Sequence, residues 1–258
     1  MSVPAGEFSP RKDGLSIIRS LLFDSHPGIR FGMSSKPGGV SPDPLGLNLS
    51  FRVGDAEENV IRNRQMFFGE LNIPLDSLAI PSQIHGDAVR TVSAPGNYEA
   101  CDSLATCTPG VYLCVTVADC VPVFLYDPVA GIVAAIHVGW QGATKGILRN
   151  TLALLTEQFG SDPRNLRVYL GPCAGPCCYE VGEEVASRFA GRFVSRTDLG
   201  TFLDLKSANV WQLNEAGVLP SFIEVSTLCT IEATRLLHSF RRDRERSGRM
   251  MGVIGLLK

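Results

Sequence analysis

Three residues that lie far apart in the chain carry the side chains that zinc prefers. They are His85 in SQIHGDAV, Cys120 in ADC and His137 in HVGW. Each stands where a strand-like run meets a turn, so the three side chains can converge at one end of a sheet. Imidazole nitrogen and thiolate sulfur are preferred zinc ligands, and three protein ligands plus water are typical of a catalytic site. These residue types predict a zinc site that activates water.

The spacing of the three residues leaves other interpretations open. The intervals from 85 to 120 and from 120 to 137 match no compact metal motif. His85 can instead be hydrogen-bonded in a turn while Cys120 packs as a small buried side chain. A third interpretation uses no metal: Cys120 is a nucleophile and a histidine is its base. Spacing alone does not separate these alternatives.

Several acidic residues and cysteines are candidates for supporting roles. Asp102 and Asp119 flank the zinc candidates in sequence, and Glu180 lies in YEVG. A carboxylate there can move a proton or orient a ligand histidine, although such residues more often stabilise turns. We take Cys120, Asp102 and Glu180 as candidate catalytic residues. We expect the neighbouring cysteines 173, 177 and 178 to pack rather than to react.

Composition is that of an ordinary globular protein. The 258 residues are 45% hydrophobic and 19% charged, with a formal net charge of −2, which excludes a strongly cationic protein and predicts no nucleic-acid partner. The start, MSVPAGEFSPRKDG, lacks the apolar region of a secretory signal, and no run reaches the ~18 apolar residues of a membrane span. We therefore expect a cytoplasmic protein without a membrane partner. Its eight cysteines are then thiols or metal ligands rather than disulfides, and no C-x-x-C spacing indicates a zinc ribbon.

The pattern of apolar residues predicts a mixture of helices and strands. Residues 1–14 are expected to be loose and 36–46 to form a loop. Runs 111–118 and 131–138 are predicted strands, joined as a hairpin through the turn DPVAG. Further strands are predicted at 166–172, 222–229 and 251–257, and helices at 58–71, 147–160, 182–191 and 207–217, with a short helix or extended turn at 232–242. Because strands and helices do not alternate strictly, we predict an α+β fold over residues 15–258, a single domain of mixed β-sheets flanked by helices.

Nine segments resemble, in order, those of the laccase-domain family, also called the multicopper polyphenol oxidase-like or purine nucleoside phosphorylase family. Some of its bacterial members are named peptidoglycan editing factors. The matching segments are GGVS (38–41), VGDAEENVIRNR (53–64), QIHG (83–86), CDSLAT (101–106), ADCVPV (118–123), HVGWQG (137–142), GPCAGPCCYEVG (171–182), LCT (228–230) and SFRRDRERSGR (239–249). Together they cover the chain from about residue 26 to its end.

The resemblance implies a zinc-dependent purine nucleoside enzyme. In such an enzyme His85, Cys120 and His137 hold the zinc, and copper is an alternative occupant. The implied reactions are phosphorolysis of adenosine, inosine, guanosine or methylthioadenosine, and deamination of adenosine; the implied partners are a purine nucleoside and phosphate. The alternative is an amidohydrolase, dependent on Cys120 or zinc, that edits peptidoglycan precursors. Four histidines are far too few for the copper centres of a multicopper oxidase, so laccase chemistry is rejected.

The resemblance also implies residues that bind substrate and phosphate. They are Lys36, Asn48, Gln83, Gln141, Arg241, Arg242 and Arg249. Two of them depart from the family pattern, which commonly has arginine where this chain has Lys36 and Gln141. Glutamine carries no charge and lysine cannot form the bidentate fork that suits phosphate. We therefore regard metal binding as better supported by the sequence than phosphate binding, and hydrolytic deamination as an activity that can survive these changes.

Overall fold

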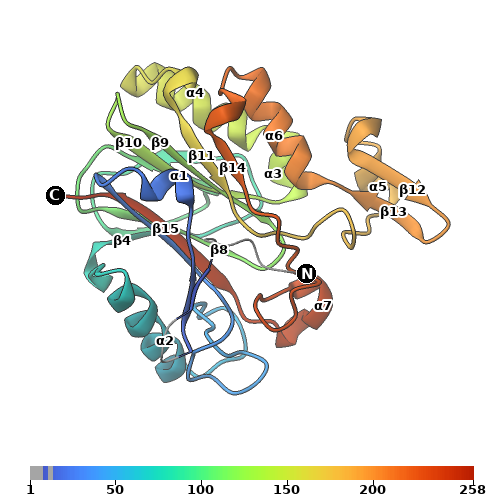
Figure 1. Ribbon diagram of the computed structural model, residues 1–258, viewed down its shortest axis with the longest axis horizontal. Coiled ribbons are helices and arrows are strands. Elements are labelled where there is room, and N and C mark those ends of the chain that lie inside the picture. Colours follow the sequence, from blue (N-terminus) through green and yellow to red (C-terminus); the bar gives the residue numbers. More distant parts are fainter. Residues whose placement is uncertain (1–7, 11–13) are drawn as a thin grey trace.

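Two β-sheets stacked face to face form the centre of the molecule, with helices on both outer sides (Figure 1). The computed structural model describes residues 8–10 and 14–258. The strands are β1 (Phe8–Pro10), β2 (Ser16–Ile18), β3 (Ile29–Ser34), β4 (Leu78–Pro81), β5 (Val89–Thr91), β6 (Gly96–Tyr98), β7 (Ser103–Thr106), β8 (Tyr112–Val117), β9 (Val121–Asp127), β10 (Ile132–Val138), β11 (Arg167–Leu170), β12 (Val194–Thr197), β13 (Gly200–Leu203), β14 (Ile223–Val225) and β15 (Met250–Leu256). The helices are α1 (Leu21–Asp24), α2 (Glu57–Glu70), α3 (Trp140–Lys145), α4 (Ile147–Phe159), α5 (Glu183–Ala186), α6 (Leu205–Glu215) and α7 (Phe240–Asp243). The predicted α+β class is confirmed.

Both large sheets contain parallel and antiparallel pairs. Within the described residues, one sheet has seven strands in the order β1-β2-β3-β15-β8-β4-β6, and the other has six in the order β14-β11-β9-β10-β7-β5. In the first sheet β15 is antiparallel to β3 and β8, while β4 is parallel to β8. Strands β12 and β13 form a separate two-stranded sheet, which projects from the body together with α5 (Figure 1).

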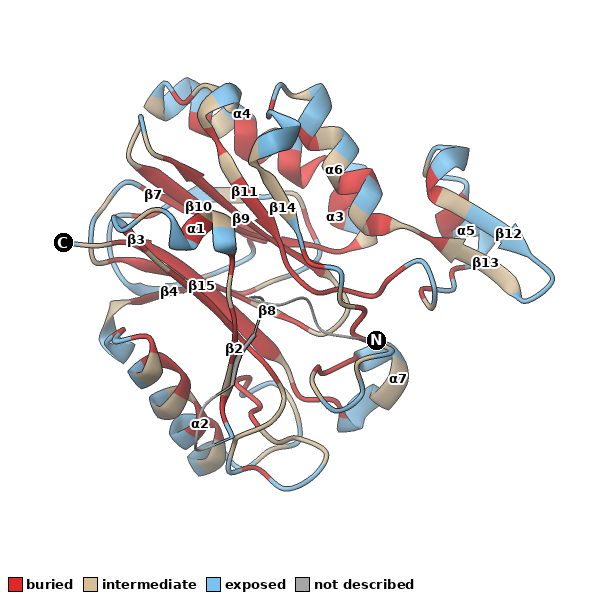
Figure 2. Cartoon of the chain, in the orientation of Figure 1, coloured by how far each residue is buried: buried red, intermediate tan, exposed pale blue. Residues whose placement is uncertain are grey.

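Three apolar clusters hold the layers together. Phe67 and Phe68 of α2 pack on the outer face of the first sheet. Between the sheets, the ring of Phe31 contacts those of Phe124 and Tyr169 at centroid distances of 5.0 and 5.2 Å. Helices α4 and α6 cover the outer face of the second sheet, with Leu152 and other leucines. Figure 2 shows the buried residues concentrated in the strands between these layers.

Strand β10 explains how a histidine enters this core. All of its residues are buried, as expected of a strand covered on both faces. Alternation along a strand sends Ile132, Ala134 and Ile136 towards the helices, and Val133 and Ala135 towards the opposite sheet. His137 lies on the same face of β10 as Val133 and Ala135, so its imidazole lies at the end of the layer between the sheets.

The prediction of a hairpin was wrong for one of its two strands. β10 pairs with β9, whereas the run 111–118 forms β8 in the other sheet, between β15 and β4. The run Val121–Asp127 was not predicted as a strand, although it leads directly into the turn DPVAG. A tight turn joins the strands on its immediate flanks, so the nearer run makes the hairpin.

Most other predicted elements are present with shifted ends. The helix predicted at 147–160 is confirmed as α4, and Gly146, at φ +91°, separates it from α3. Helix α6 begins before residue 207 because Asp204 caps it, accepting a hydrogen bond from the Ser207 N–H at 2.9 Å. The predicted helix at 182–191 is helical only over α5. Residues 232–242 form turns followed by the start of α7.

The expected loose segment 1–14 is only partly described. Phe8–Pro10 form β1, which pairs with β2, so this part is a strand. Residues 1–7 and 11–13 lie outside the described residues. Among the helices that are described, none has both the length and the apolar character needed to cross a membrane.

Candidate active site

His85, Cys120 and His137 converge at one end of the layer between the sheets. Their potential ligand atoms all lie within 4.8 Å of one another. In the β9–β10 hairpin Pro122 lies opposite His137. Cys120, which directly precedes β9, therefore lies next to the end of β10. His85 arrives from the loop between β4 and β5, and its imidazole ring contacts that of His137 with 4.8 Å between centroids. The expectation from the sequence that these side chains lie at strand ends is confirmed for Cys120 and His137, whereas His85 lies within the loop between β4 and β5.

One buried carboxylate orients two of these residues. Asp102 Oδ1 lies 2.7 Å from His137 Nδ1 and accepts the His85 N–H at 3.0 Å. Its Oδ2 accepts the N–H groups of Ile84 and Gly86 at 3.1 and 2.8 Å. Burial raises the pKa of Asp102, but these hydrogen bonds outweigh it and hold the pKa below its usual value. The carboxylate therefore orients the His137 ring through Nδ1, which would leave Nε2 available to a metal ion.

One residue of the cluster and the residue directly before Cys120 have left-handed backbone conformations. His85 has φ +58° and Asp119 has φ +98°, values that non-glycine residues rarely adopt. The Asp119 carboxylate accepts hydrogen bonds from Thr230 Oγ1 and from the Arg241 N–H, both at 2.6 Å. These contacts offset the cost of the conformation and turn the next residue, Cys120, towards the histidines. Asp119 thus anchors the site and has little freedom to carry protons.

The electrostatics favour a thiolate facing an imidazolium. Burial raises the pKa of Cys120, but the facing His137 and His85 outweigh it and lower this pKa to about 6. Burial lowers the pKa of His137, but Cys120 and Asp102 reverse this and raise it to about 9. A thiolate is the form of cysteine that binds metals or attacks electrophiles.

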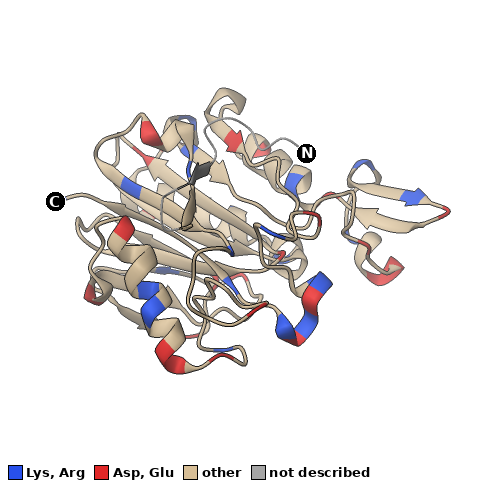
Figure 3. Ribbon diagram, turned by 60° about the horizontal axis from the view of Figure 1, so that its bottom comes forward, with Lys and Arg blue, Asp and Glu red and all other residues tan. Residues whose placement is uncertain are grey.

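The cluster opens into a cavity of about 460 Å³. The side chains lining it include three arginines and two aromatic residues: Arg52, Arg241, Arg249, Tyr179 and Phe240. The Arg241 guanidinium lies 5.2 Å from the Tyr179 ring centroid, and that of Arg249 lies 5.3 Å from the Phe240 ring centroid. Figure 3 shows charged residues of both signs along α7, and two residues of this helix, Phe240 and Arg241, line the cavity. A cavity of this kind suits an anionic group together with a flat ring.

Only some of the residues predicted to bind substrate line this cavity. Gln83, Arg241 and Arg249 do. Gln83 is held in place by Thr116, whose N–H and hydroxyl donate to Oε1 at 2.8 and 2.9 Å.

The other predicted residues have structural contacts among the described residues. Asn48 is fully buried and donates to Asp55 at 2.8 Å. Arg242 donates to the carbonyls of Thr230, Ile231 and Leu237, and pairs with Asp243. Lys36 Nζ donates to the Thr234 carbonyl at 3.4 Å. Gln141, on α3, and Glu180, which forms a bridge with Phe202, are exposed and are not among the residues lining the cavity.

Among the lining residues that were not singled out from the sequence, three have charged or aromatic side chains. Arg52 directly precedes the quoted segment VGDAEENVIRNR, while Tyr179 and Phe240 lie inside quoted segments. Their positions next to or within these family segments were the sequence signal that could have identified them. Burial raises the pKa of Tyr179 to about 12, aided by the nearby Cys120 thiolate and opposed by Arg241, so its hydroxyl remains a donor.

The donor set fits a metal ion. Two imidazoles and a thiolate suit zinc or copper, and His85, Cys120 and His137 would hold such an ion with one coordination position left for water or substrate. A Cβ placed on Gly139 would lie 3.0 Å from His85 Cδ2 and 3.1 Å from Cys120 Sγ, so the glycine keeps space open beside the ligands. The remaining histidines are elsewhere: His26 packs on Tyr126, and His238 is buried outside the cavity.

Comparison with known proteins places this chain in one family. Residues 30–257 match the family model described as Multi-copper polyphenol oxidoreductase laccase, so the chain belongs to that family. Purine nucleoside phosphorylase YlmD of Bacillus subtilis is 34% identical over 244 residues, covering 87% of each chain. A purine nucleoside phosphorylase of Deinococcus radiodurans is 37% identical over 248 residues, 94% of each chain. The crystal structure of YlmD from Geobacillus stearothermophilus has a TM-score of 0.90 and 33% identity, covering 98% of this chain and 99% of that one.

Proposed function

We propose that this protein is a zinc-dependent purine nucleoside phosphorylase. The observation that carries the proposal is the convergence of His85, Cys120 and His137 in a cavity that arginines also line. The relatives named purine nucleoside phosphorylase, which share the fold over nearly the whole chain, support the same substrate class. Zinc is the proposed metal because imidazole nitrogen and thiolate sulfur are among its preferred ligands and three protein ligands are typical of a catalytic zinc site.

The cavity walls supply the contacts that phosphorolysis requires. In the proposed reaction a phosphate oxygen bonds to the anomeric carbon, the glycosidic bond breaks, and the purine leaves after it gains a proton. Arg241 and Arg249 are suited to hold the phosphate, with Arg52 as a third cation. Phe240, with 39% of its surface exposed, offers a face on which the purine can stack. The protonated Tyr179 hydroxyl can donate a hydrogen bond to substrate.

The open coordination position supports adenosine deamination as a second activity. A bound zinc ion supplies a Lewis acid and lowers the pKa of a bound water towards ~7. Asp102 holds His137 in position for this, and its low pKa keeps it a hydrogen-bond acceptor. Deamination does not need phosphate, so it is independent of the arginines that we assign to phosphate.

Chromatography of adenosine incubations tests both activities. We expect the wild-type protein to release adenine, or hypoxanthine after deamination, only when phosphate is added, and to form inosine with or without phosphate. Cys120→Ala should lose both activities, while Cys107→Ser, at an exposed cysteine, should keep them. Absence of any product from the wild type would overturn the proposal. Cleavage of an amino-acyl muramyl precursor instead would then favour the amidohydrolase, with the Cys120 thiolate as nucleophile.

A cytoplasmic location is part of the same proposal. All eight cysteines are free thiols, which suits a reducing compartment. Phosphate and purine nucleosides are soluble intracellular metabolites, so the proposed substrates are available there.

A further inference from the structure

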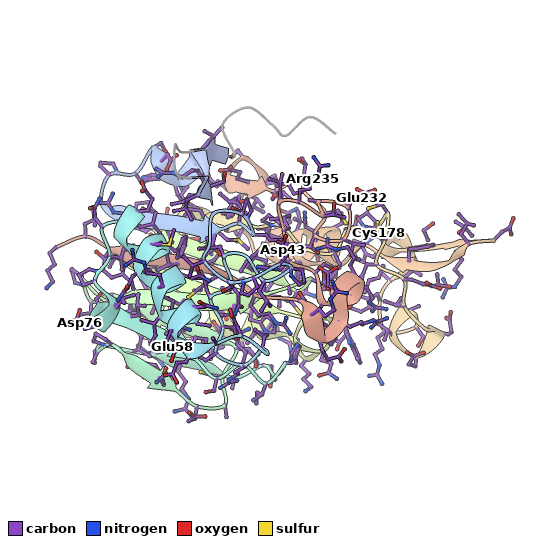
Figure 4. All side chains as sticks on the ribbon, turned by 90° about the horizontal axis from the view of Figure 1, so that it is seen from below. Asp43, Glu58, Asp76, Cys178, Glu232 and Arg235 are labelled. Carbon is purple, nitrogen blue, oxygen red and sulfur yellow. The ribbon has the colours of Figure 1, made fainter. Side chains whose placement is uncertain are left out.

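A second group of metal-ligating side chains lies outside the cavity described above. The Sγ atoms of Cys177, Cys178 and Cys229 and a carboxylate oxygen of Glu232 all lie within 4.8 Å of one another. Figure 4 labels Cys178 and Glu232, which lie next to each other. Cys177 and Cys178, predicted from the sequence to pack, instead lie beside a third thiol and a carboxylate.

Local backbone geometry assembles this cluster. The N–H groups of Cys178 and Tyr179 donate to the Gly175 carbonyl at 3.0 and 2.8 Å, which folds the chain into a tight turn. This turn places Cys178 Sγ 3.2 Å from Cys177 Sγ. Cys229 arrives from a distant segment that forms a β-bridge with Cys173. The Gly175 N–H also donates to Cys229 Sγ at 3.3 Å, which holds this third thiol beside the turn.

A Cβ at Gly175 would crowd the thiols. It would lie 3.3 Å from Cys229 Cβ and 3.4 Å from Cys177 Sγ, so glycine permits their close approach. The cluster borders a cavity of about 690 Å³, which Cys177, Cys229 and Glu232 help to line, so an ion can reach it from solvent.

The ligand atoms of the three cysteines and of Glu232 all lie within 4.8 Å of one another, close enough to bind a single ion. Three sulfurs and one oxygen form a ligand set that a cation completes.

We propose that Cys177, Cys178, Cys229 and Glu232 bind a second zinc ion, which has a structural role. In a tetrahedral site with Zn–S bonds of about 2.3 Å, sulfur atoms lie roughly 3.8 Å apart. Here the sulfur atoms of Cys177 and Cys178 are 3.2 Å apart and no pair of ligand atoms is more than 4.8 Å apart, so small side-chain movements would reach that geometry. The carboxylate favours zinc over the softer copper(I) ion. Four protein ligands close the coordination shell, as in structural zinc sites.

The second site joins a segment that lines the first cavity to a segment that holds one of its lining residues. Cys178 precedes Tyr179, which lines the first cavity. Cys229 precedes Thr230, whose hydroxyl holds Asp119 at 2.6 Å and whose carbonyl accepts from Arg242 at 2.7 Å. Zinc bound to both segments would fix their separation and thereby the shape of the first cavity.

Zinc stoichiometry of the purified full chain tests the proposal without any turnover measurement. Elemental analysis after gel filtration is expected to give two zinc ions per wild-type chain. We expect one in Cys177→Ser, which loses the second site, and one in His85→Ala, which loses the first. The double variant should contain none, and Cys107→Ser, at an exposed cysteine outside both clusters, should keep two.

Other outcomes would overturn the proposal. One zinc ion in the wild type, unchanged in Cys177→Ser and lost in His85→Ala, would show that the cysteine cluster binds none. Preferential uptake of copper(I) when both metals are supplied would reject zinc. If Cys177→Ser fails to fold, Glu232→Gln at an exposed position provides the test. We expect this variant to release one equivalent at a lower chelator concentration than the wild type, and an unchanged release curve would contradict the site.

Discussion

Asp102 and His137 form the closest link between the proposed metal ligands and the core. The Nδ1–Oδ1 distance is 2.7 Å, and both residues are buried. The backbones of the two residues are also hydrogen-bonded: the His137 N–H donates to the Asp102 carbonyl at 2.7 Å. Since the same carboxylate accepts the His85 N–H, one side chain sets the positions of two ligands that come from different segments.

Replacing Asp102 by asparagine should weaken metal binding while leaving the cysteine ligand intact. The amide NH₂ would face hydrogen-bond donors, so at least one of the N–H groups now bound by the carboxylate would lose its acceptor. We expect the affinity for zinc to fall by about 10–100-fold, measured by competition with a chelator. Asp198→Asn, in an exposed turn, is the control and should bind as the wild type does. Equal affinities in the two variants would show that Asp102 does not position the ligands.

Gly139→Ala should disturb the same site through volume alone. The added methyl group would lie 3.0 Å from His85 Cδ2 and 3.1 Å from Cys120 Sγ, so one of these ligands must move. We expect less zinc per chain and loss of activity, with a circular dichroism spectrum like that of the wild type. Gly69→Ala is the control because its Cβ meets nothing within 4 Å. Full zinc occupancy in Gly139→Ala would contradict the tight packing described here.

The convergence of His85, Cys120 and His137 was predictable because few residue types suit a metal and because ends of strands bring such residues together. The fold class was also predictable, since the apolar runs distinguish helices from strands. The pairing of the strands, in contrast, was not predictable from the sequence. β8 and β9 are both apolar and lie close together in sequence, but only tertiary packing places them in different sheets.

The arginines show why the rest of the site was not predictable. Arg241 and Arg242 are adjacent and have the same side chain, yet the first lines the cavity and the second is held by backbone carbonyls. Similarly, Cys178 and Cys229 come together only through long-range contacts. Which group faces a cavity depends on neighbours that are distant in the chain.

Arg241→Gln should impair use of phosphate more than binding of nucleoside. Its guanidinium lies in the cavity over Tyr179, whereas its backbone N–H alone makes the contact with Asp119. Loss of a charge-assisted hydrogen bond costs about 1.5–3 kcal/mol, so the KM for phosphate should rise by about tenfold or more. Arg246→Gln, which is exposed and outside the cavity lining, is the control. If both variants have the wild-type KM, Arg241 does not bind phosphate.

His238→Leu should make the protein less sensitive to acid. Both ring nitrogens of His238 are buried without a hydrogen-bond partner among the described residues. Burial, with Lys36 and Arg249 nearby, lowers the pKa of His238 to about 3 from its ordinary value of 6.5. The unfolded chain therefore binds a proton that the folded protein does not, and the free energy of unfolding falls as pH drops from about 6.5 towards 3.

Urea unfolding at pH 7 and pH 5.5 measures this effect. Below about pH 6 the wild type should lose up to about 1.4 kcal/mol per pH unit through this histidine, and His238→Leu should lack that contribution. The metal ligands are the same in both proteins, so their titration cancels in the comparison. His26→Leu, at a less buried histidine, should change the pH dependence less. Identical pH dependence in His238→Leu and the wild type would mean that His238 is protonated in the folded protein or gains a partner there.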